Sequence, residues 1–190
     1  GLTEITLPFI GHERGNNEAG AGGESVFGYI FDEAYWDKDS AVRVCQYWNR
    51  SNPVFSNIPK NLTTVTITDE TVIPWGAFMN CSMLTSLTYP MTVTFLGGQA
   101  FYSCTGLSDL PIPAGVKTIP YQCFYGCTAL PENYVIPDTV EKIASYAYQN
   151  CKSIKKLTVP DSVQTIDSAA FCNCTGLTEI TLPFIGHERG

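Results

Sequence analysis

Cysteine is the side chain with the greatest capacity for chemistry in this chain. Five of its eight cysteines recur at intervals of 23 or 24 residues: Cys81, Cys104, Cys127, Cys151 and Cys174. A thiol can ligate a metal, form a disulfide or act as a nucleophile, and each role needs a suitably placed partner. If the repeats stack, neighbouring cysteines come within the Cα spacing of a disulfide, but their parallel Cβ directions hold the Cβ atoms too far apart for the bond. We therefore interpret the five as free thiols in a core, where cysteine behaves as a small hydrophobic residue.

Other residues that could do chemistry are few. His12 and His187 are the only histidines, and the second is a duplicate of the first. Neither belongs to a zinc-binding spacing or a Ser-His-Asp set, and the chain has no phosphate-binding loop. Acidic residues around Asp37 and Asp39 match no calcium-loop spacing, so a solvated loop is favoured. The sequence predicts no enzyme, no cofactor and no metal site.

The element that positions the five cysteines is a short repeat. Each cysteine follows an aromatic residue by three positions, and an aliphatic residue follows the cysteine by three. The full unit reads A-F-x-x-C-x-x-L-x-x-L-x-x-P-x-x-V-x-x-I. Its aromatic positions are Phe78, Phe101, Phe124, Tyr148 and Phe171. The pattern predicts an aromatic ladder and a thiol ladder along one common core.

This unit resembles the BspA-like class of leucine-rich repeats. The stretch most similar to that class is residues 154–174, IKKLTVPDSVQTIDSAAFCNC, and the resemblance extends continuously over residues 62–183. Residues 1–10 resemble the start of one further unit. The resemblance implies a curved solenoid and a surface or secreted location, and it implies no catalytic residue.

Physical chemistry favours the same architecture independently. A unit of this length cannot bury its own apolar face, so neighbouring units must stack. Ile154, Leu157 and Val159 are spaced as in a short strand entered from a turn, and a proline ends each strand. We predict a leucine-rich-repeat solenoid of short parallel strands and turns with little helix, in a right-handed curved stack. Neighbouring strands should lie about 4.8 Å apart.

A longer period encloses the short one. Residues 1–15 recur without change as residues 176–190, which gives a period of 175 residues. Six short repeats fill this period, and the first is enlarged by an insert over residues 11–60. We interpret residues 1–190 as a single solenoid excerpted from a tandem array, with residues 176–190 restarting the next super-repeat. Residues 1–10 and 176–185 should then form the same strand in the same surroundings.

The insert departs from the repeat and is rich in aromatic residues. Alternation of Phe27, Tyr29 and Phe31 predicts a strand, and Asp39 or Ser40 could cap a short helix over residues 41–49. Two interpretations of the aromatic residues stay open. They form a small core that holds the insert on the solenoid, or a surface that binds glycan or protein. The candidate surface residues are Tyr35, Trp36, Tyr47 and Trp48.

Charge and hydropathy exclude other functions. The net charge of −7 argues against nucleic-acid binding, and no apolar run approaches the roughly 18 residues of a membrane span. The preferred hypothesis is an extracellular structural or adhesive fibre of tandem super-repeats, in which each copy does the same work. The alternative is a discrete adhesin or receptor domain that binds a host protein or glycan. An enzyme is disfavoured because no catalytic constellation is present.

The first expected partner is a second copy of the chain. Neither end of the repeat has a polar cap, so head-to-tail stacking into a filament is expected. Cys45 and Cys172 lie outside the thiol ladder, and the extracellular location implied by the resemblance permits disulfides. We predict a bond between Cys172 of one super-repeat and Cys45 of the next. The alternative is two unpaired thiols, with Cys172 exposed.

Overall fold

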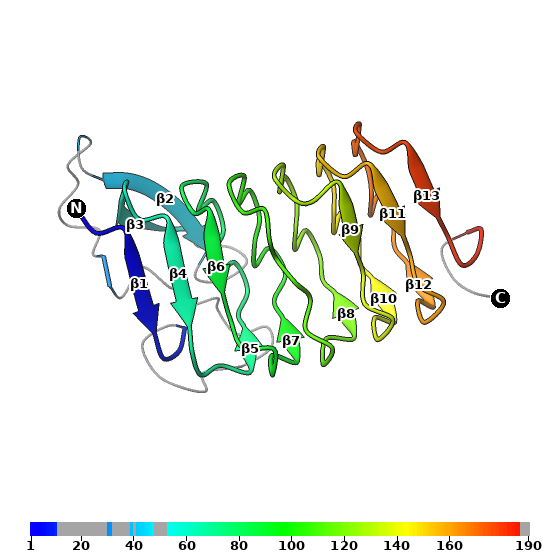
Figure 1. Ribbon diagram of the computed structural model, residues 1–190, viewed down its shortest axis with the longest axis horizontal. Coiled ribbons are helices and arrows are strands. Elements are labelled where there is room, and N and C mark those ends of the chain that lie inside the picture. The colour runs from blue at the N-terminus through cyan, green and yellow to red at the C-terminus, as the bar shows by residue number, and fades with distance from the viewer. Residues whose placement is uncertain (11–29, 32–38, 40, 48–52, 187–190) are drawn as a thin grey trace.

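The chain forms a solenoid whose short strands stack side by side along one axis (Figure 1). The computed structural model describes residues 1–10, 30, 31, 39, 41–47 and 53–186, with only the backbone of residues 45–47, 53 and 54. Within these ranges the chain has thirteen strands and no helix. The predicted class, a repeat solenoid of short parallel strands, is confirmed.

One column of parallel strands forms the first face of the solenoid. Its members are β1 (Glu4–Leu7), β4 (Thr64–Ile67), β6 (Ser86–Thr88), β9 (Asn133–Val135), β11 (Lys156–Thr158) and β13 (Glu179–Thr181). Equivalent residues stay in register: Ile5 faces Val65, and Leu157 lies between Tyr134 and Ile180. Exposed and buried residues alternate along β6, β9 and β11, because successive side chains point to opposite faces. Each interior strand therefore buries its central apolar residue.

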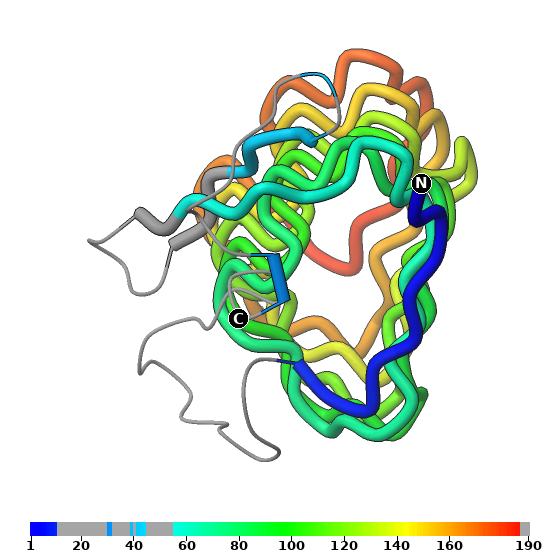
Figure 2. Tube along the Cα trace, turned by 90° about the vertical axis from the view of Figure 1, so that its left-hand side faces the viewer, coloured from blue at the N-terminus to red at the C-terminus, as the bar shows by residue number. Residues whose placement is uncertain are grey.

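A second column runs parallel to the first. It comprises β5 (Val72–Ile73), β7 (Phe95–Leu96), β8 (Thr118–Ile119), β10 (Lys142–Ile143) and β12 (Thr165–Ile166). β5 pairs with β7, and β10 lies between β8 and β12. The aliphatic residue that ends each strand is buried in the first four. Viewed along the stack, successive coils superimpose closely, so equivalent side chains meet inside (Figure 2).

The turn with the aromatic residue and the cysteine links each coil to the next through backbone hydrogen bonds. The Phe78 N–H donates to the Ala100 carbonyl at 2.8 Å, and the Phe124 N–H donates to the Ala147 carbonyl at 2.9 Å. Two residues in each such turn have left-handed backbones, for example Gln122 at a φ of 51°. That conformation costs a non-glycine residue roughly 1–2 kcal/mol. Glycine or asparagine fills half of these positions, and at the others, such as Gln122 and Tyr146, the bonds between coils hold a residue that does not favour the conformation.

The described part of the insert is a two-stranded antiparallel hairpin, β2 (Ala41–Tyr47) and β3 (Pro53–Pro59). The helix predicted over residues 41–49 is therefore wrong. Val44 is 1% exposed while Arg43 is exposed, an alternation typical of a half-buried strand. Valine favours this pleated setting, and packing decides over a possible helix cap. Along the stack, the hairpin lies on the opposite side of the coil from β1 (Figure 2).

The hairpin takes the place of the aromatic-cysteine turn in the first coil. Ile58 is fully buried and belongs to the same core cluster as the repeats. The Leu62 N–H donates to the Pro59 carbonyl at 2.9 Å, just as the Leu84 N–H donates to the Cys81 carbonyl. Pro59 thus occupies the position of a ladder cysteine. The hairpin closes the first coil with its own apolar face.

Candidate functional site

The first column is interrupted in its middle at residues 109–112. Leu110 occupies the central strand position there, equivalent to Leu87, and Pro111 follows it at the position of Thr88, where proline has no N–H for a ladder. The sheets β1-β4-β6 and β13-β11-β9 end on either side of this segment. Two tyrosines bond to it instead: the Tyr89 hydroxyl donates to the Pro111 carbonyl at 2.6 Å, and the Tyr134 hydroxyl donates to the Leu110 carbonyl at 2.8 Å. Side-chain bonds from both neighbouring coils therefore hold the interrupting segment.

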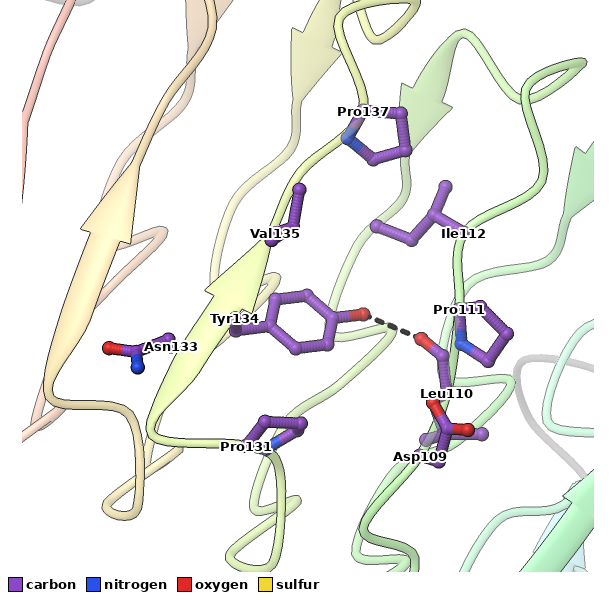
Figure 3. A pocket seen from close by; sticks show the side chains of 9 residues that line it. All are labelled: Asp109, Leu110, Pro111, Ile112, Pro131, Asn133, Tyr134, Val135 and Pro137. Carbon is purple, nitrogen blue, oxygen red and sulfur yellow. Dashed lines mark hydrogen bonds between the residues drawn. The ribbon is translucent and has the colours of Figure 1, made fainter.

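A hollow of about 330 Å³ lies at this interruption (Figure 3). Val135 is 76% exposed beside it, and the lining residues are Asp109, Leu110, Pro111, Ile112, Pro131, Asn133, Tyr134, Val135 and Pro137. Burial raises the pKa of the Tyr89 and Tyr134 hydroxyls well above their usual range, so both stay protonated donors. Those hydroxyls already have acceptors in the protein. The hollow can therefore hold a small apolar group, and its lining has no nucleophile paired with a base.

An uncharged surface stripe lies at a corner of the coils, between the second column and the aromatic-cysteine turns. We call it the neutral stripe. Its exposed or half-buried members are Trp75, Gln99, Tyr121, Gln122 and Tyr146, and the buried Gly98 lies beneath the Trp75 ring. Trp75 stacks on Tyr121 with ring centroids 6.3 Å apart, and Tyr146 meets Tyr121 edge-on at 6.0 Å. Sequence analysis missed this surface. The signal was available in the Gly97-Gly98 pair, which replaces larger residues of the other repeats beside a tryptophan.

The two ends of the solenoid contain the same sequence in opposite surroundings. Ile10 is 3% exposed, and its N–H donates to the Glu70 carboxylate at 3.4 Å. Ile185, its duplicate, is fully exposed. Residues 1–10 and 176–185 both include a strand, β1 and β13, as predicted. The prediction that they share the same surroundings is wrong, because β4 covers only the first copy.

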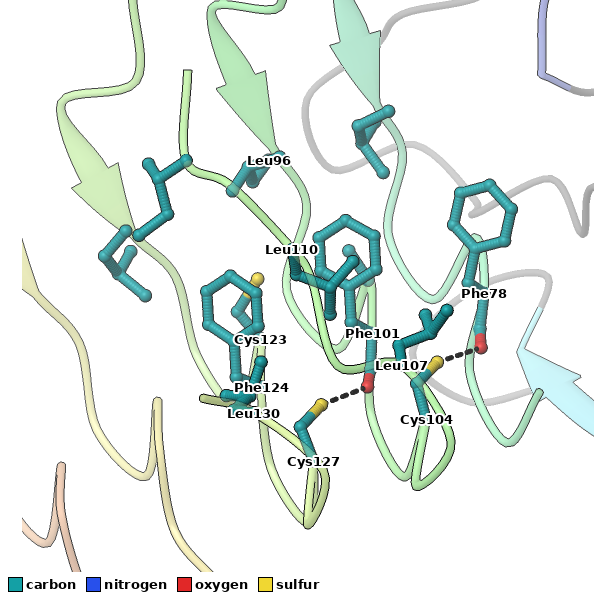
Figure 4. Close-up of a cluster of buried hydrophobic side chains, with 14 of the residues drawn as sticks. Phe78, Leu96, Phe101, Cys104, Leu107, Leu110, Cys123, Phe124, Cys127 and Leu130 are labelled. Atoms are coloured by element: carbon teal, nitrogen blue, oxygen red, sulfur yellow. Dashed lines mark hydrogen bonds between the residues drawn. The ribbon is translucent and has the colours of Figure 1, made fainter. Parts of the chain in front are cut away.

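The thiol ladder lies inside the aromatic-cysteine turns (Figure 4). The Cys104 Sγ donates to the Phe78 carbonyl at 3.0 Å, and the Cys127 Sγ donates to the Phe101 carbonyl at 3.1 Å. Cys151 and Cys174 repeat this bond to the preceding coil, on Phe124 and Tyr148. Cys81 bonds within its own coil, to the Met79 carbonyl at 3.8 Å. The thiols are thus weak cross-links between neighbouring coils.

Burial makes these thiols unreactive. Removal from water raises the pKa of Cys104, Cys123 and Cys127 well above the usual range of a thiol. Because the thiolate is the nucleophile and the metal ligand, a protonated buried thiol serves neither role. Cys174 in the last coil is only half-buried, and its pKa is raised by the same cause. Cys172 is a half-buried free thiol.

The aromatic ladder runs beside the thiols. Neighbouring rings are stacked with centroids between 5.2 and 5.9 Å apart, in the order Phe78, Phe101, Phe124, Tyr148 and Phe171. The first four are fully buried, while Phe171 in the last coil is partly buried. Offset stacking of this kind adds about 0.5–1.5 kcal/mol per pair beyond area burial. The ladder therefore defines the spacing of the coils.

Several predicted site residues lie outside the described part of the chain. They are Tyr35, Trp36 and Trp48 of the candidate aromatic surface, with Phe27 and Tyr29 of the predicted strand. The backbones of Tyr47 and Cys45 belong to β2, and their side chains are not described. Both interpretations of the insert, and the bond between Cys45 and Cys172, therefore stay predictions. Phe31 lies in a bend and packs against the core.

Clusters of ligating side chains are also absent from the described ranges. Among these residues no three of His, Cys, Asp and Glu lie close enough to hold a metal ion. No helix there has the length and hydropathy to cross a membrane. The candidate functional features of the described residues are therefore three surfaces: the hollow, the neutral stripe, and the uncovered coil at the C-terminal end.

Comparison with solved structures finds repeat proteins of bacteria. The T. pallidum leucine-rich repeat protein TpLRR aligns with a TM-score of 0.57 and 27% identity, over 62% of this chain and 58% of that one. A leucine-rich repeat protein from Bacteroides ovatus aligns with a TM-score of 0.61 and 26% identity, over 78% of this chain and 41% of that one. A leucine-rich cell surface protein from Faecalibacterium prausnitzii shares the fold, with a TM-score of 0.59 and 22% identity over 95% and 48%. The chain thus spans about half the length of these proteins.

Comparison of sequences gives the family. A search of curated proteins finds no match. A family model described as the BspA type leucine-rich repeat region matches residues 49–178 in six copies, which is more than half of the chain. The matched span includes every stacked ring and every thiol cross-link described above. The chain belongs to the BspA-type leucine-rich repeat family.

Proposed function

We propose that this chain is one super-repeat of an extracellular array that stacks end to end into a fibre-like solenoid, with a structural or adhesive role. The contrast between Ile10 and Ile185 is the main support, because one sequence is docked at one end and uncovered at the other. Terminal repeats normally need a polar outer face. An apolar, sequence-matched end is instead suited to receive a further coil.

The docked copy indicates how the next super-repeat would fit. β1 pairs with β4 over four residues, from Glu4 opposite Thr64 to Leu7 opposite Ile67. The Thr68 N–H donates to the Leu7 carbonyl at 3.0 Å. Because residues 176–186 have the sequence of residues 1–11, the β4 of a following super-repeat would meet the same groups on β13. Covering one aliphatic side chain fully is worth about 1.5–3 kcal/mol.

The Glu70 carboxylate would hold the contact between neighbouring super-repeats. It is one of three buried polar residues among those described, with Ser56 and Asn57, and it is the only ionisable one. Its Oε2 accepts the Ile10 N–H, and its Oε1 accepts the Thr71 N–H at 2.9 Å. One carboxylate thus ties the docked segment to the turn before β5. In an array, Ile185 of one super-repeat is also Ile10 of the next, and Glu70 of that next super-repeat would accept its N–H.

The test is a chain that contains residues 1–175 twice, followed by residues 176–190. In this chain residue 185 is also Ile10 of the second unit, so we expect its amide exchange to slow to the rate of Ile10 of the first unit, and small-angle scattering to show one rigid rod. Glu70→Gln in the second unit should speed exchange at that Ile185 and leave Ile10 of the first unit unchanged. Two units that scatter as flexibly joined beads would reject the array whatever the exchange rate at residue 185, because Ile10 and Glu70 belong to the same unit.

An extracellular setting fits the family, and the structurally similar F. prausnitzii protein is a cell surface protein. A second candidate function is a discrete adhesin domain that binds a host protein or glycan. The observations that favour it are the hollow at residues 109–137 and the neutral stripe. Electron microscopy separates the two functions, since fibres favour the array and compact single particles favour the adhesin domain.

A further inference from the structure

The neutral stripe contains aromatic rings and amides from four consecutive coils, and we propose that it binds an uncharged saccharide. Tyr121 at its centre is 40% exposed, and Trp75 and Tyr146 on either side are half-buried. This proposal goes beyond stacking into an array, because the stripe lies along the side of the solenoid and not at its ends.

Two adjacent glycines allow the tryptophan to reach across a whole coil. A Cβ at Gly98 would lie 2.2 Å from Cζ3 of the Trp75 ring, and a Cβ at Gly97 would lie 2.3 Å from the Trp75 backbone nitrogen. The indole therefore occupies the space of the missing side chain. It continues to Tyr121, two repeats away, with an angle of 17° between the ring planes. Aromatic rings from alternate coils thereby become neighbours on the surface.

A chain of hydrogen bonds fixes an amide donor next to these rings. The Trp75 Nε1–H donates to the Gln99 Oε1 at 3.2 Å, and the Gln99 Nε2–H donates to the Gln122 Oε1 at 2.7 Å. The Gln122 Nε2 then donates to no group of the described residues. Each bond in such a chain polarises the next. The last member is an oriented donor pair beside Tyr121, ready for an acceptor from outside the protein.

The chemistry of the stripe selects the class of ligand. A sugar ring presents C–H groups that pack on aromatic rings, and hydroxyl oxygens that accept from amides. The stripe has no charged member, while the ion pairs Lys117–Glu141 and Lys142–Asp167 belong to the adjoining second column. A charged ligand would find no counterion within the stripe. A purely apolar ligand would leave the Gln122 amide desolvated without a partner.

The test uses the full chain and three neutral probes: maltohexaose, cellohexaose and hexa-N-acetylchitohexaose. The expected result is that at least one of them gives saturable shifts of the Trp75 indole N–H and the Gln122 side-chain amide in ¹⁵N-correlated NMR spectra. Isothermal titration then gives the dissociation constant. The two reporters should shift together, because one chain of hydrogen bonds joins them.

The repeats themselves supply fold-compatible variants. Tyr121→Ser introduces the residue found at the equivalent Ser145 and Ser168, and Gln122→Ala introduces that of Ala169. Each should weaken the bound saccharide about tenfold or more, which corresponds to about 1.4 kcal/mol. The matched control is Tyr125→Gln, as in Gln149, which removes a ring from the separate Tyr102–Tyr125 pair and should leave affinity unchanged.

Three results would overturn the proposal. The first is that none of the three saccharides binds. The second is that Tyr121→Ser leaves the affinity for the bound saccharide unchanged. The third is that Tyr125→Gln weakens this affinity as much as Tyr121→Ser does. None of these results bears on stacking at Ile185, so failure here is distinguishable from failure of the array. If the stripe binds sugar, an array repeats it once per super-repeat, and avidity then rises without any new contact.

Discussion

Residues 1–10 and 176–185 are the same sequence placed at opposite ends of one solenoid. In the first copy, the early residue Leu2 is exposed and the late residue Ile10 is buried under the following coil. In the second copy the gradient reverses, since Leu177 is half-buried on the preceding coil and Ile185 is fully exposed. Identical residues thus differ only in which neighbour is present. In this fold the burial of a strand is determined by the coils stacked on either side of it and not by its own sequence.

The same gradient extends into the last complete coil. Phe171 and Cys174 are half-buried, although their equivalents in the preceding coils are fully buried. Stability in such stacks is the sum of a term for each repeat and a term for each interface. The last coil has one interface where interior coils have two. Variants at matched positions in interior and terminal coils therefore measure the missing interface directly.

Thiol labelling should show the largest contrast. Cys104 and Cys127 are buried and protonated, so a maleimide reaches them only after the coils open. We expect them to react roughly a thousandfold more slowly than Cys172, as followed by mass spectrometry of digested peptides. In the chain with two super-repeats, Cys174 of the first unit should slow toward the interior rate. Equal rates at all sites would mean that the ladder opens freely.

The same thiols should make the fold sensitive to alkali. Unfolded thiols ionise near pH 8.5, whereas burial raises the pKa of the Cys127 thiol well above that value in the folded chain. Above that pH the unfolded state binds fewer protons than the folded state, so the free energy of unfolding falls as pH rises. Below it the contribution is constant. Urea titrations between pH 8 and 10 measure the slope, and Cys127→Ala should reduce it.

The ring ladder should give the next largest contrast. Phe101→Ala removes a fully buried ring stacked on both sides and should cost about 3–5 kcal/mol. Phe171→Ala removes a half-buried ring stacked on one side, and should cost roughly half as much, since less area is lost. Chemical denaturation of both variants tests this. In the chain with two super-repeats, Phe171→Ala in the first unit should cost more than in this chain, because the first coil of the second unit then covers the ring, although it offers no ladder ring to stack on.

The repeat was predictable because its physics is periodic. The spacing of Cys104, Cys127 and their equivalents determines which side chains meet, and the stack follows from it. Residues 41–47 were not predictable in the same way, since the 190 residues contain the insert only once and packing of Val44 outweighed a possible helix cap. A periodic sequence pattern predicts the structure of the repeats, whereas the structure of the insert depends on its tertiary contacts.

The candidate surfaces were missed for a related reason. The hollow arises where Pro111 breaks the strand column, and the neutral stripe arises where Gly98 admits the ring of Trp75. Both arise at positions where one repeat departs from the consensus, and the consensus unit does not show such departures. The residues were visible as deviations at fixed positions of the unit. Their consequence was not, because it depends on how far Trp75 reaches along the stack.

The duplicated isoleucine gives a direct comparison of one residue in two settings. Ile10→Ala should cost about 2–5 kcal/mol because it opens a cavity under β4, whereas Ile185→Ala should cost almost nothing in this chain. Denaturation measured by circular dichroism gives both values. With two super-repeats, Ile185→Ala in the first unit should become as costly as Ile10→Ala. If it stays silent there, the following coil does not cover this residue.

The smallest expected effect concerns backbone strain in the last coil. Ala169 has a φ of 57°, a left-handed conformation that costs alanine roughly 1–2 kcal/mol. Ala169→Gly relieves this strain but adds about 0.5–1 kcal/mol of unfolded-state entropy, so a net gain of about 0.5–1 kcal/mol in the free energy of unfolding is expected. The buried Ala170 is the control, since Ala170→Gly relieves no such strain and should destabilise. If the last coil frays, the gain in the free energy of unfolding will be smaller in this chain. In the chain with two super-repeats, Ala169→Gly in the first unit should then give the full gain. A loss of stability in both chains would show that the turn is unstrained.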